Sequence, residues 1–122
     1  MTKHIESQYQ CAVIQYCKYL EAQIPALKWI HCSLNGARLT PHRAARAKAE
    51  GMKAGIFDLF WPVPSGKWHG LYIEMKKPNG KLTDLQKEFL EFGERQGYCM
   101  RVAFDPQEAM KIIKQYYGLT GI

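Results

Sequence analysis

Three charged residues stand in two apolar segments that have the pattern of strands. Asp58 lies within "IFDLFW", and Glu74 and Lys76 lie two apart in "LYIEMKK". Because side chains alternate along a strand, Glu74 and Lys76 share one face, about 7 Å apart. If the register brings Asp58 beside Glu74, two carboxylates crowd together with an ammonium close by, and they resist joint ionisation unless a cation lies between them. Such hard oxygen ligands favour a divalent metal, Mg²⁺ above all.

Magnesium held by only two protein carboxylates keeps several waters and leaves positions open for a phosphate. The metal polarises that phosphate and lowers the pKa of an attacking water. Lys76 would neutralise charge on the scissile phosphate or orient the water. The pattern therefore favours metal-assisted hydrolysis of a phosphodiester. A second interpretation stays open, since a Glu and a Lys two apart in an edge strand are most often a solvated polar face, and Asp58 alone could be an exposed strand residue.

These residues need a framework, and the apolar periodicity and turn residues predict one. The first predicted elements are a helix over 5–20, a strand over 27–34 and a basic helix from Thr40-Pro41 to Gly51. Two strands over 56–61 and 69–76 follow, joined by a hairpin, and then a helix opened by the capping box "TDLQ" with Leu85, Phe89 and Phe92 on one face. A strand over 98–104 leads to a last helix, opened by "DPQE", with Ala109, Ile112, Ile113 and Tyr116 inward. This order predicts an α/β domain, with helices packed on a mixed sheet.

Length and composition narrow the class of protein. A chain of 122 residues that is 47% hydrophobic is expected to form one globular domain, residues 1–122. The start "MTKHIESQYQ" has no apolar signal region, and no apolar run approaches the length of a membrane span. The cysteines are scattered, without a CxxC pair or a zinc-site spacing. We therefore expect a protein that is cytoplasmic, not secreted and not membrane-bound, with reduced and mostly buried thiols.

The basic residues predict an anionic partner. Seventeen Lys and Arg against eleven Asp and Glu give a net charge of +6, which favours nucleic acid, although solubility alone is the competing explanation. Phosphate contacts from such residues would position a duplex without reading its sequence. The stretch before Asp58 forms the basic helix, whose alternative interpretation is an ordinary solvated face. The candidate DNA contacts are Arg38, Arg43, Arg46, Lys48, Lys53, Lys77 and Lys81.

The segments "GIFDLFWP" and "GLYIEMKKPNGKLTDLQKEFL" together resemble the VRR-NUC (virus-type replication-repair nuclease) branch of the PD-(D/E)XK nucleases. The matching pieces are Asp58 in GxxDL, the ExK of Glu74 and Lys76, the following "GKLTDLQ", and an early Glu in the first helix, Glu6. They cover nearly the whole chain in the family's order. The chain departs from the family at two apolar positions. Phe57 stands where the family often has Pro, and Met75 stands where the ExK motif commonly has Leu; neither change removes a catalytic group.

The resemblance implies a restriction-endonuclease-like (PD-(D/E)XK) core, a mixed central sheet flanked by helices. It implies that Asp58 and Glu74 bind Mg²⁺ or Mn²⁺ with the backbone carbonyl of Met75, and that Lys76 is the catalytic lysine. Glu6 would reach in from the first helix, and Gln86 from the helix after ExK. Both have competing explanations. An acid in the first turn of a helix is stabilised by the macrodipole, and Gln86 is already the third residue of a capping box.

The resemblance further implies a structure-selective DNA endonuclease of phage or bacterial type, acting on branched DNA such as four-way (Holliday) junctions. A homodimer is expected, because a junction needs two symmetric nicks and a two-fold dimer supplies two sites. Aromatic side chains could form its apolar patch, although each could equally be core: Trp61, Trp68, Tyr116 and Tyr117. Two alternatives remain, a non-catalytic nucleic-acid-binding module on the same fold and an RNA-directed nuclease. The retention of Asp58, Glu74 and Lys76 together favours the enzyme.

Overall fold

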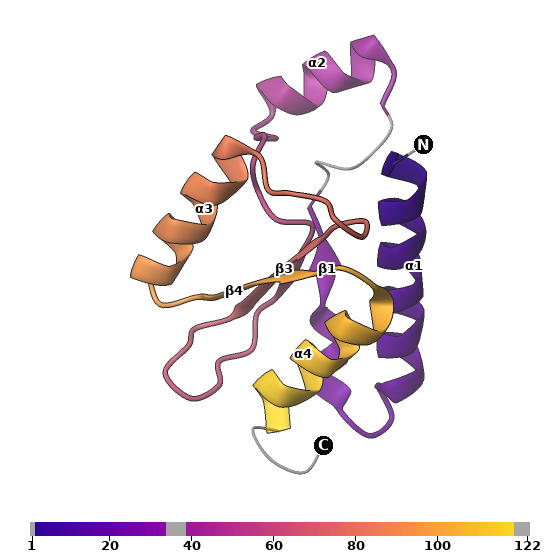
Figure 1. Ribbon diagram of the computed structural model, residues 1–122, viewed down its shortest axis with the longest axis vertical. Helices are drawn as coiled ribbons and strands as arrows, with labels where there is room; N and C mark the ends of the chain where they lie inside the picture. The colour runs from indigo at the N-terminus through magenta and orange to yellow at the C-terminus, as the bar shows by residue number, and fades with distance from the viewer. Residues whose placement is uncertain (1, 34–38, 119–122) are drawn as a thin grey trace.

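The computed structural model describes residues 2–33 and 39–118. Within these ranges the elements follow in the predicted order, with one additional 3-10 helix (Figure 1). The helices are α1 (Thr2–Leu20), η1 (Pro25–Trp29), α2 (Pro41–Ala49), α3 (Asp84–Arg95) and α4 (Pro106–Gly118). The strands are β1 (His31–Cys32), β2 (Leu59–Trp61), β3 (Leu71–Met75) and β4 (Cys99–Ala103).

The strands form one mixed sheet in the order β1-β2-β3-β4. The first two pairings are antiparallel, and β2 and β3 form the predicted hairpin with Leu59 opposite Ile73. β4 pairs with β3 in parallel, and α3 makes the crossover between them, as a parallel connection requires. The predicted mixed sheet flanked by helices is therefore confirmed.

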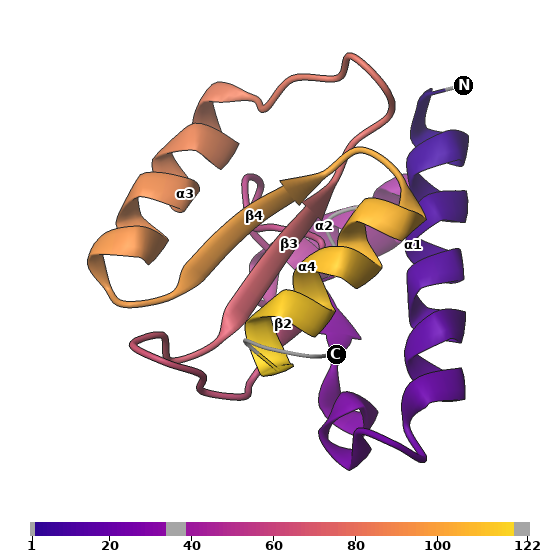
Figure 2. The same ribbon diagram turned by 60° about the horizontal axis from the view of Figure 1, so that its bottom comes forward.

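One face of the sheet carries the hydrophobic core. Helices α1 and α4 lie side by side against it, with α3 on the other flank of β3 and β4 (Figure 2). The four predicted inward residues of α4, namely Ala109, Ile112, Ile113 and Tyr116, are buried, and Met110 is buried with them. Trp61 is fully buried, and its indole N–H donates to the Ala26 carbonyl at 2.7 Å. Trp61 and Tyr116 are therefore core residues and belong to no exposed aromatic patch.

Helix α3 packs on the opposite face, but rotated from the predicted orientation. Phe89 contacts Phe57 and Tyr72, and Gly93 lies so close to Met100 that a Cβ would collide with it. Leu85 and Phe92 are about half exposed, at 52% and 53%, so their predicted inward position is wrong. The residues of α3 that face the sheet are instead 86, 89, 90 and 93. The polar Gln86 is therefore among the inward side chains.

Two predicted strands are shorter than expected. The segment 27–34 begins as part of η1 and leaves only two residues to β1, because Pro25 opens a 3-10 turn that buries Leu27. The segment 56–61 becomes a strand only at Leu59. Asp58 therefore lies directly before β2 rather than within it.

The cysteines differ from the prediction of mostly buried thiols. All four are free, but only Cys17 is buried, while Cys11 and Cys32 are exposed. Cys11 lies on the outer side of α1 and Cys32 on the edge strand β1, so neither position is covered by another element. Over the ranges 2–33 and 39–118, no helix has the length and apolar content needed to span a membrane.

Candidate active site

Asp58 and Glu74 meet at the open end of the β2–β3 pair. Since Leu59 is opposite Ile73, the preceding Asp58 lies level with Glu74. The backbone N–H of Asp58 donates to Glu74 Oε1 at 3.1 Å, and Asp58 Oδ2 accepts the Met75 N–H at 2.9 Å. Each carboxylate therefore accepts a hydrogen bond from the backbone of the segment opposite it, and these two bonds fix the orientation of both groups.

Lys76 completes a buried charged group. Its Nζ lies 3.5 Å from Glu74 Oε2, and Glu74 and Lys76 are only 3% and 8% exposed. These values exclude the solvated polar face as the explanation of the ExK pattern. Burying an ionic pair costs desolvation free energy that its attraction only partly offsets. Its location therefore points to a role other than stability.

Helices α1 and α3 each add one polar side chain. Glu6 Oε2 accepts the Lys77 backbone N–H at 3.1 Å, which ties α1 to the end of β3. Because α1 begins at Thr2, Glu6 lies beyond its first turn, so the macrodipole explanation of this acid is wrong. Gln86 Nε2 donates to Glu74 Oε2 at 2.9 Å, while Gln86 Oε1 accepts the Thr83 N–H at 3.0 Å. The same amide thus completes the capping box and orients Glu74.

The electrostatics of the two carboxyl groups are unusual. Burial, followed by the nearby Asp58 charge, raises the pKa of Glu74 to about 8. Burial also raises the pKa of Asp58, and the charge of Glu6 adds to this effect. The opposing attraction of Lys76 is too weak to restore either pKa to its usual range. Near neutral pH the pair therefore retains a proton unless another cation replaces it.

The donor set fits a hard divalent cation of low protein coordination. Within residues 2–33 and 39–118, no group of three or more His, Cys, Asp and Glu side chains is placed to hold a metal. Two carboxylates suffice for magnesium, which keeps several waters. The N–H and C=O of one strand residue point to the same edge, so the Met75 carbonyl faces the Asp58 side like its N–H. The arrangement agrees with the expected ligand set of Asp58, Glu74 and the Met75 carbonyl.

Helix α2, which carries three of the predicted DNA contacts, lies at the end of the molecule where α1 and α3 begin (Figure 1). Helix α2 buries none of its residues, and it exposes Arg43, Arg46 and Lys48. Arg46 Nε lies 3.7 Å from Glu50, but both side chains are at least two-thirds exposed, so this pair is weak. Lys53 and Lys81 are also exposed, and Lys77 is partly buried. Arg38 lies outside the described residues.

Two further residues lie near the carboxylates, namely Gly55, the glycine of GxxDL, and Ser33, which belongs to no motif. Gly55 has φ +93° and packs so closely on α3 that a Cβ would meet Leu85 at 2.8 Å, so it sets the distance between α3 and the Asp58 segment. Ser33 donates its backbone N–H to the Asp58 carbonyl at 2.7 Å. A strand-register argument for β1 would have found Ser33, but the predicted strand over 27–34 offered no register.

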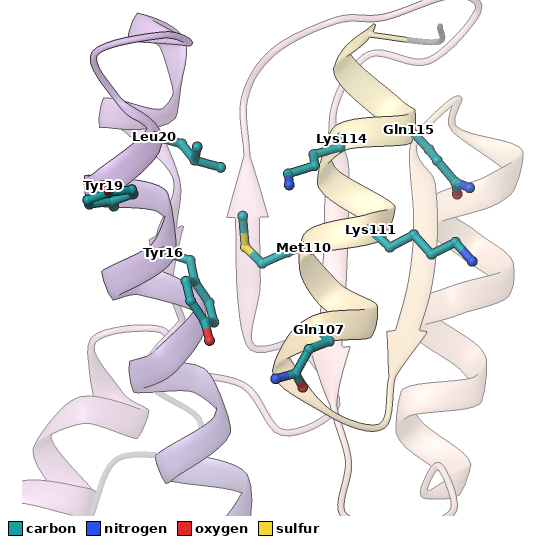
Figure 3. A pocket seen from close by; sticks show the side chains of 8 residues that line it. All are labelled: Tyr16, Tyr19, Leu20, Gln107, Met110, Lys111, Lys114 and Gln115. Atoms are coloured by element: carbon teal, nitrogen blue, oxygen red, sulfur yellow. The ribbon is translucent and has the colours of Figure 1, made fainter. Parts of the chain in front are cut away.

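A groove of about 640 Å³ lies between α1 and α4, away from these carboxylates (Figure 3). Tyr16 and Leu20 of α1 face Met110 and Lys114 of α4 across it, and Tyr19 lines its rim. None of the candidate catalytic residues lines the groove. The groove is therefore separate from the polar centre at the end of β3.

Comparison with known proteins agrees with this geometry. The VRR-NUC domain family matches residues 2–104. A solved structure described as a VRR_NUC domain protein superposes with a TM-score of 0.74 at 32% sequence identity, covering 94% of this chain and 89% of that one. No curated protein matches the chain. The matched segment includes Glu6, Asp58, Glu74, Lys76 and Gln86, and with the shared mixed α/β fold it shows that this chain belongs to the VRR-NUC family.

Proposed function

We propose that residues 1–122 act as a single metal-dependent nuclease domain that hydrolyses phosphodiester bonds in DNA. The observation that carries this proposal is the half-buried Asp58 beside the buried Glu74 and Lys76. A binding module that only contacts phosphates needs exposed cations. It has no use for two adjacent acids shielded from solvent, which repel phosphate and destabilise the fold.

The cation would be Mg²⁺ or Mn²⁺, held by Asp58, Glu74 and the Met75 carbonyl. When bound, it would polarise the scissile phosphate and lower the pKa of an attacking water. Lys76 would stabilise charge that develops on the phosphate oxygens. Gln86 keeps Glu74 oriented through its 2.9 Å hydrogen bond. Glu6 adds negative charge near Asp58 and thereby favours a cation there.

The DNA would lie across the exposed basic residues of α2 and the segments that flank the carboxylates. Cations for the phosphates lie at the end of the molecule where α1 and α3 begin (Figure 1). They are Arg43, Arg46 and Lys48 on α2, with Lys53, Lys77 and Lys81. Such contacts read no bases, so selectivity would come from the shape of the DNA. We propose that this shape is a branch such as a four-way junction, and that two chains form a homodimer that places one site on each symmetric strand.

Labelled linear duplex, flap, four-way DNA and an RNA duplex, each incubated with the protein in Mg²⁺, in Mn²⁺ or in excess EDTA, test the proposal. We expect cation-dependent cleavage that is fastest on the four-way junction. Cleavage at full rate in EDTA would refute the proposed requirement for a divalent cation. Faster cleavage of RNA than of every DNA would reassign the substrate, and binding without cleavage under all conditions would leave only the binding module.

A further inference from the structure

The hydroxyl of Ser33 is buried and has no hydrogen-bond partner among the residues that the structure describes. An isolated buried hydroxyl destabilises the folded state when no partner compensates its lost hydration. The described residues supply no such partner to Ser33. Its position next to Asp58 indicates where a partner could come from.

Strand geometry places the Ser33 side chain on the same face as the carboxylates. The His31 and Phe60 rings are directly opposite each other and in contact, with centroids 5.8 Å apart. Side chains return to the same face every second residue. Ser33 is two residues after His31 and Asp58 is two residues before Phe60, so both side chains lie on this face and opposite each other. The Ser33 N–H bond to the Asp58 carbonyl shows that the pairing continues to this point.

The Glu74 side chain lies on the same face of the sheet, on the strand that flanks Asp58 opposite to Ser33. The Phe60 ring contacts Tyr72, and Glu74 follows Tyr72 by two residues. Ser33, Asp58 and Glu74 therefore form one row across β1, β2 and β3, with Asp58 in the middle. Directly opposite residues have Cβ atoms about 5 Å apart, so a rotation of the Ser33 hydroxyl group about its Cα–Cβ bond brings its oxygen within reach of the Asp58 carboxylate.

We propose that Ser33 is a positioning residue of this centre, whose hydroxyl donates a hydrogen bond to the Asp58 carboxylate when that carboxylate holds the divalent cation. The inference rests on the proposed function, since it assumes that Asp58 is a ligand. Carboxylates that bind metals are themselves held by hydrogen bonds from neighbouring groups. A serine hydroxyl suits this task because it can rotate to donate, and its hydrogen bond is stronger when the acceptor is ionised. Ser33 would thus favour the cation-bound state over the free protein.

Titration calorimetry with MnCl₂, without DNA, compares the wild type with Ser33→Ala, Ser33→Thr and Ser65→Ala. Because loss of such a supporting group weakens metal affinity 10- to 100-fold, we expect Ser33→Ala to raise the Kd for Mn²⁺ about 10-fold. Ser33→Thr keeps the hydroxyl and should stay close to wild type. Ser65 is the matched control, since its hydroxyl already donates to the Tyr116 carbonyl at 2.5 Å and it does not contact the centre.

Thermal unfolding in EDTA separates positioning from structure. Ser33→Ala removes an unpartnered hydroxyl and should leave the Tm unchanged or raised, whereas Ser65→Ala loses a hydrogen bond and should lower it. Ser33→Ala that binds Mn²⁺ as tightly as wild type would overturn the role of Ser33 alone. An equal loss of affinity in Ser65→Ala, or a large drop in Tm for Ser33→Ala, would make the effect structural. A wild type that binds no Mn²⁺ would overturn both this inference and the proposed function.

Discussion

Asp58 is half-buried beside the buried Glu74, so the joint ionisation of the two carboxyl groups depends on a positive charge. Lys76 supplies one such charge at 3.5 Å from Glu74, and it is not enough to return the pKa of Glu74 to its usual range. Buried like charges are destabilising, and proteins keep them mainly where function needs them. Two predictions follow at the scale of these residues.

Removal of either acid should abolish cleavage and spare the fold. We expect Asp58→Ala and Glu74→Ala to lose DNA cleavage in Mg²⁺, because each removes one of two ligand carboxylates. In EDTA both variants should still unfold cooperatively, because the loss of mutual repulsion offsets part of the cost of losing the hydrogen bonds that each carboxylate accepts. Glu91→Ala, which changes an exposed acid of α3, is the control and should cleave normally. Normal cleavage by both site variants would refute the assignment.

Stability without metal should fall as the pH rises. The pKa of Glu74 is 4.5 as a free side chain and about 8 in the fold, so the folded state binds more protons between these values. The free energy of unfolding that protonated Glu74 contributes is therefore fully present below about pH 4.5, and it is lost as the pH rises to about 8. Urea unfolding in EDTA should show a decline of a few kcal/mol, at about 1.4 kcal/mol per pKa unit.

Glu74→Gln should flatten that decline, because the amide does not titrate, while Glu91→Gln should keep it. A Glu74→Gln profile that falls as steeply as the wild type would show that other groups cause the pH dependence.

The contacts of the site were only partly predictable at this scale. The alternation of "LYIEMKK" and the hairpin were enough to bring Asp58 beside Glu74, because a hairpin with a short linker has few registers. Glu6 and Ser33 reach the centre through tertiary contacts with distant segments. No local pattern encodes those contacts. The family resemblance pointed to Glu6, and nothing in the sequence pointed to Ser33.

At the scale of elements, α2 and α3 have opposite relations to the core. α3 packs on the sheet through Phe89 and Gly93, whereas α2 buries none of its residues. Both begin with a threonine cap, since Thr40 Oγ1 accepts the Arg43 N–H and Thr83 Oγ1 accepts the Gln86 N–H. The caps are chemically alike, and their surroundings differ.

The same substitution should therefore have different effects at the two caps. Thr83→Ala should lower the free energy of unfolding by about 1 kcal/mol, the usual cost of a lost cap. It should also reduce kcat, because the Gln86 backbone N–H loses its acceptor and the first turn of α3, which carries the Gln86 side chain, frays. Thr40→Ala should change global stability by less than about 0.5 kcal/mol, since α2 can fray without opening the core. Urea unfolding of both variants measures the contrast. Equal losses would show that α2 is coupled to the core.

Helix α2 should instead determine the salt dependence of DNA binding. If about 5 phosphates are neutralised, log K should fall against log salt with a slope near −4 to −5. Arg43→Ala with Arg46→Ala should reduce that slope by about 2. Lys18→Ala with Lys28→Ala removes the same charge from exposed positions on α1 and η1 and should leave the slope unchanged. Equal effects of the two double variants would indicate a contribution of net charge alone.

The order of helices and strands was predictable because each carries a local signal such as a cap, a turn pair or a period. The extent of β1 and the rotation of α3 were not. β1 is short because Pro25 and Leu27 build a 3-10 turn whose burial depends on the core. α3 turns Gln86 inward at the expense of Leu85, a choice that hydrophobic periodicity alone predicts wrongly.

At the scale of the whole molecule, one chain presents one Asp58–Glu74 centre among its described residues. Resolution of a four-way junction requires two nicks related by two-fold symmetry. Light scattering over a concentration series should therefore give about twice the monomer mass of 14.1 kDa, with and without junction DNA. A mass that stays at the monomer value with junction DNA bound would exclude the dimer.

Mapping of the cleaved strands tests the symmetry itself. Paired nicks at equivalent positions across the junction are the expected result. Single nicks scattered along linear duplex at the same rate would reduce the protein to a general nuclease.

The bond between Glu6 and the Lys77 backbone joins positions 71 apart in the chain. Closing so long a loop costs entropy that only later contacts repay, so we expect α1 to dock late during folding. β3 must also wait for its parallel partner β4, which ends at Ala103. A chain still growing on the ribosome therefore cannot assemble the centre until its first hundred or so residues have emerged. The proposed cleavage activity would accordingly arise only after those residues have been synthesised.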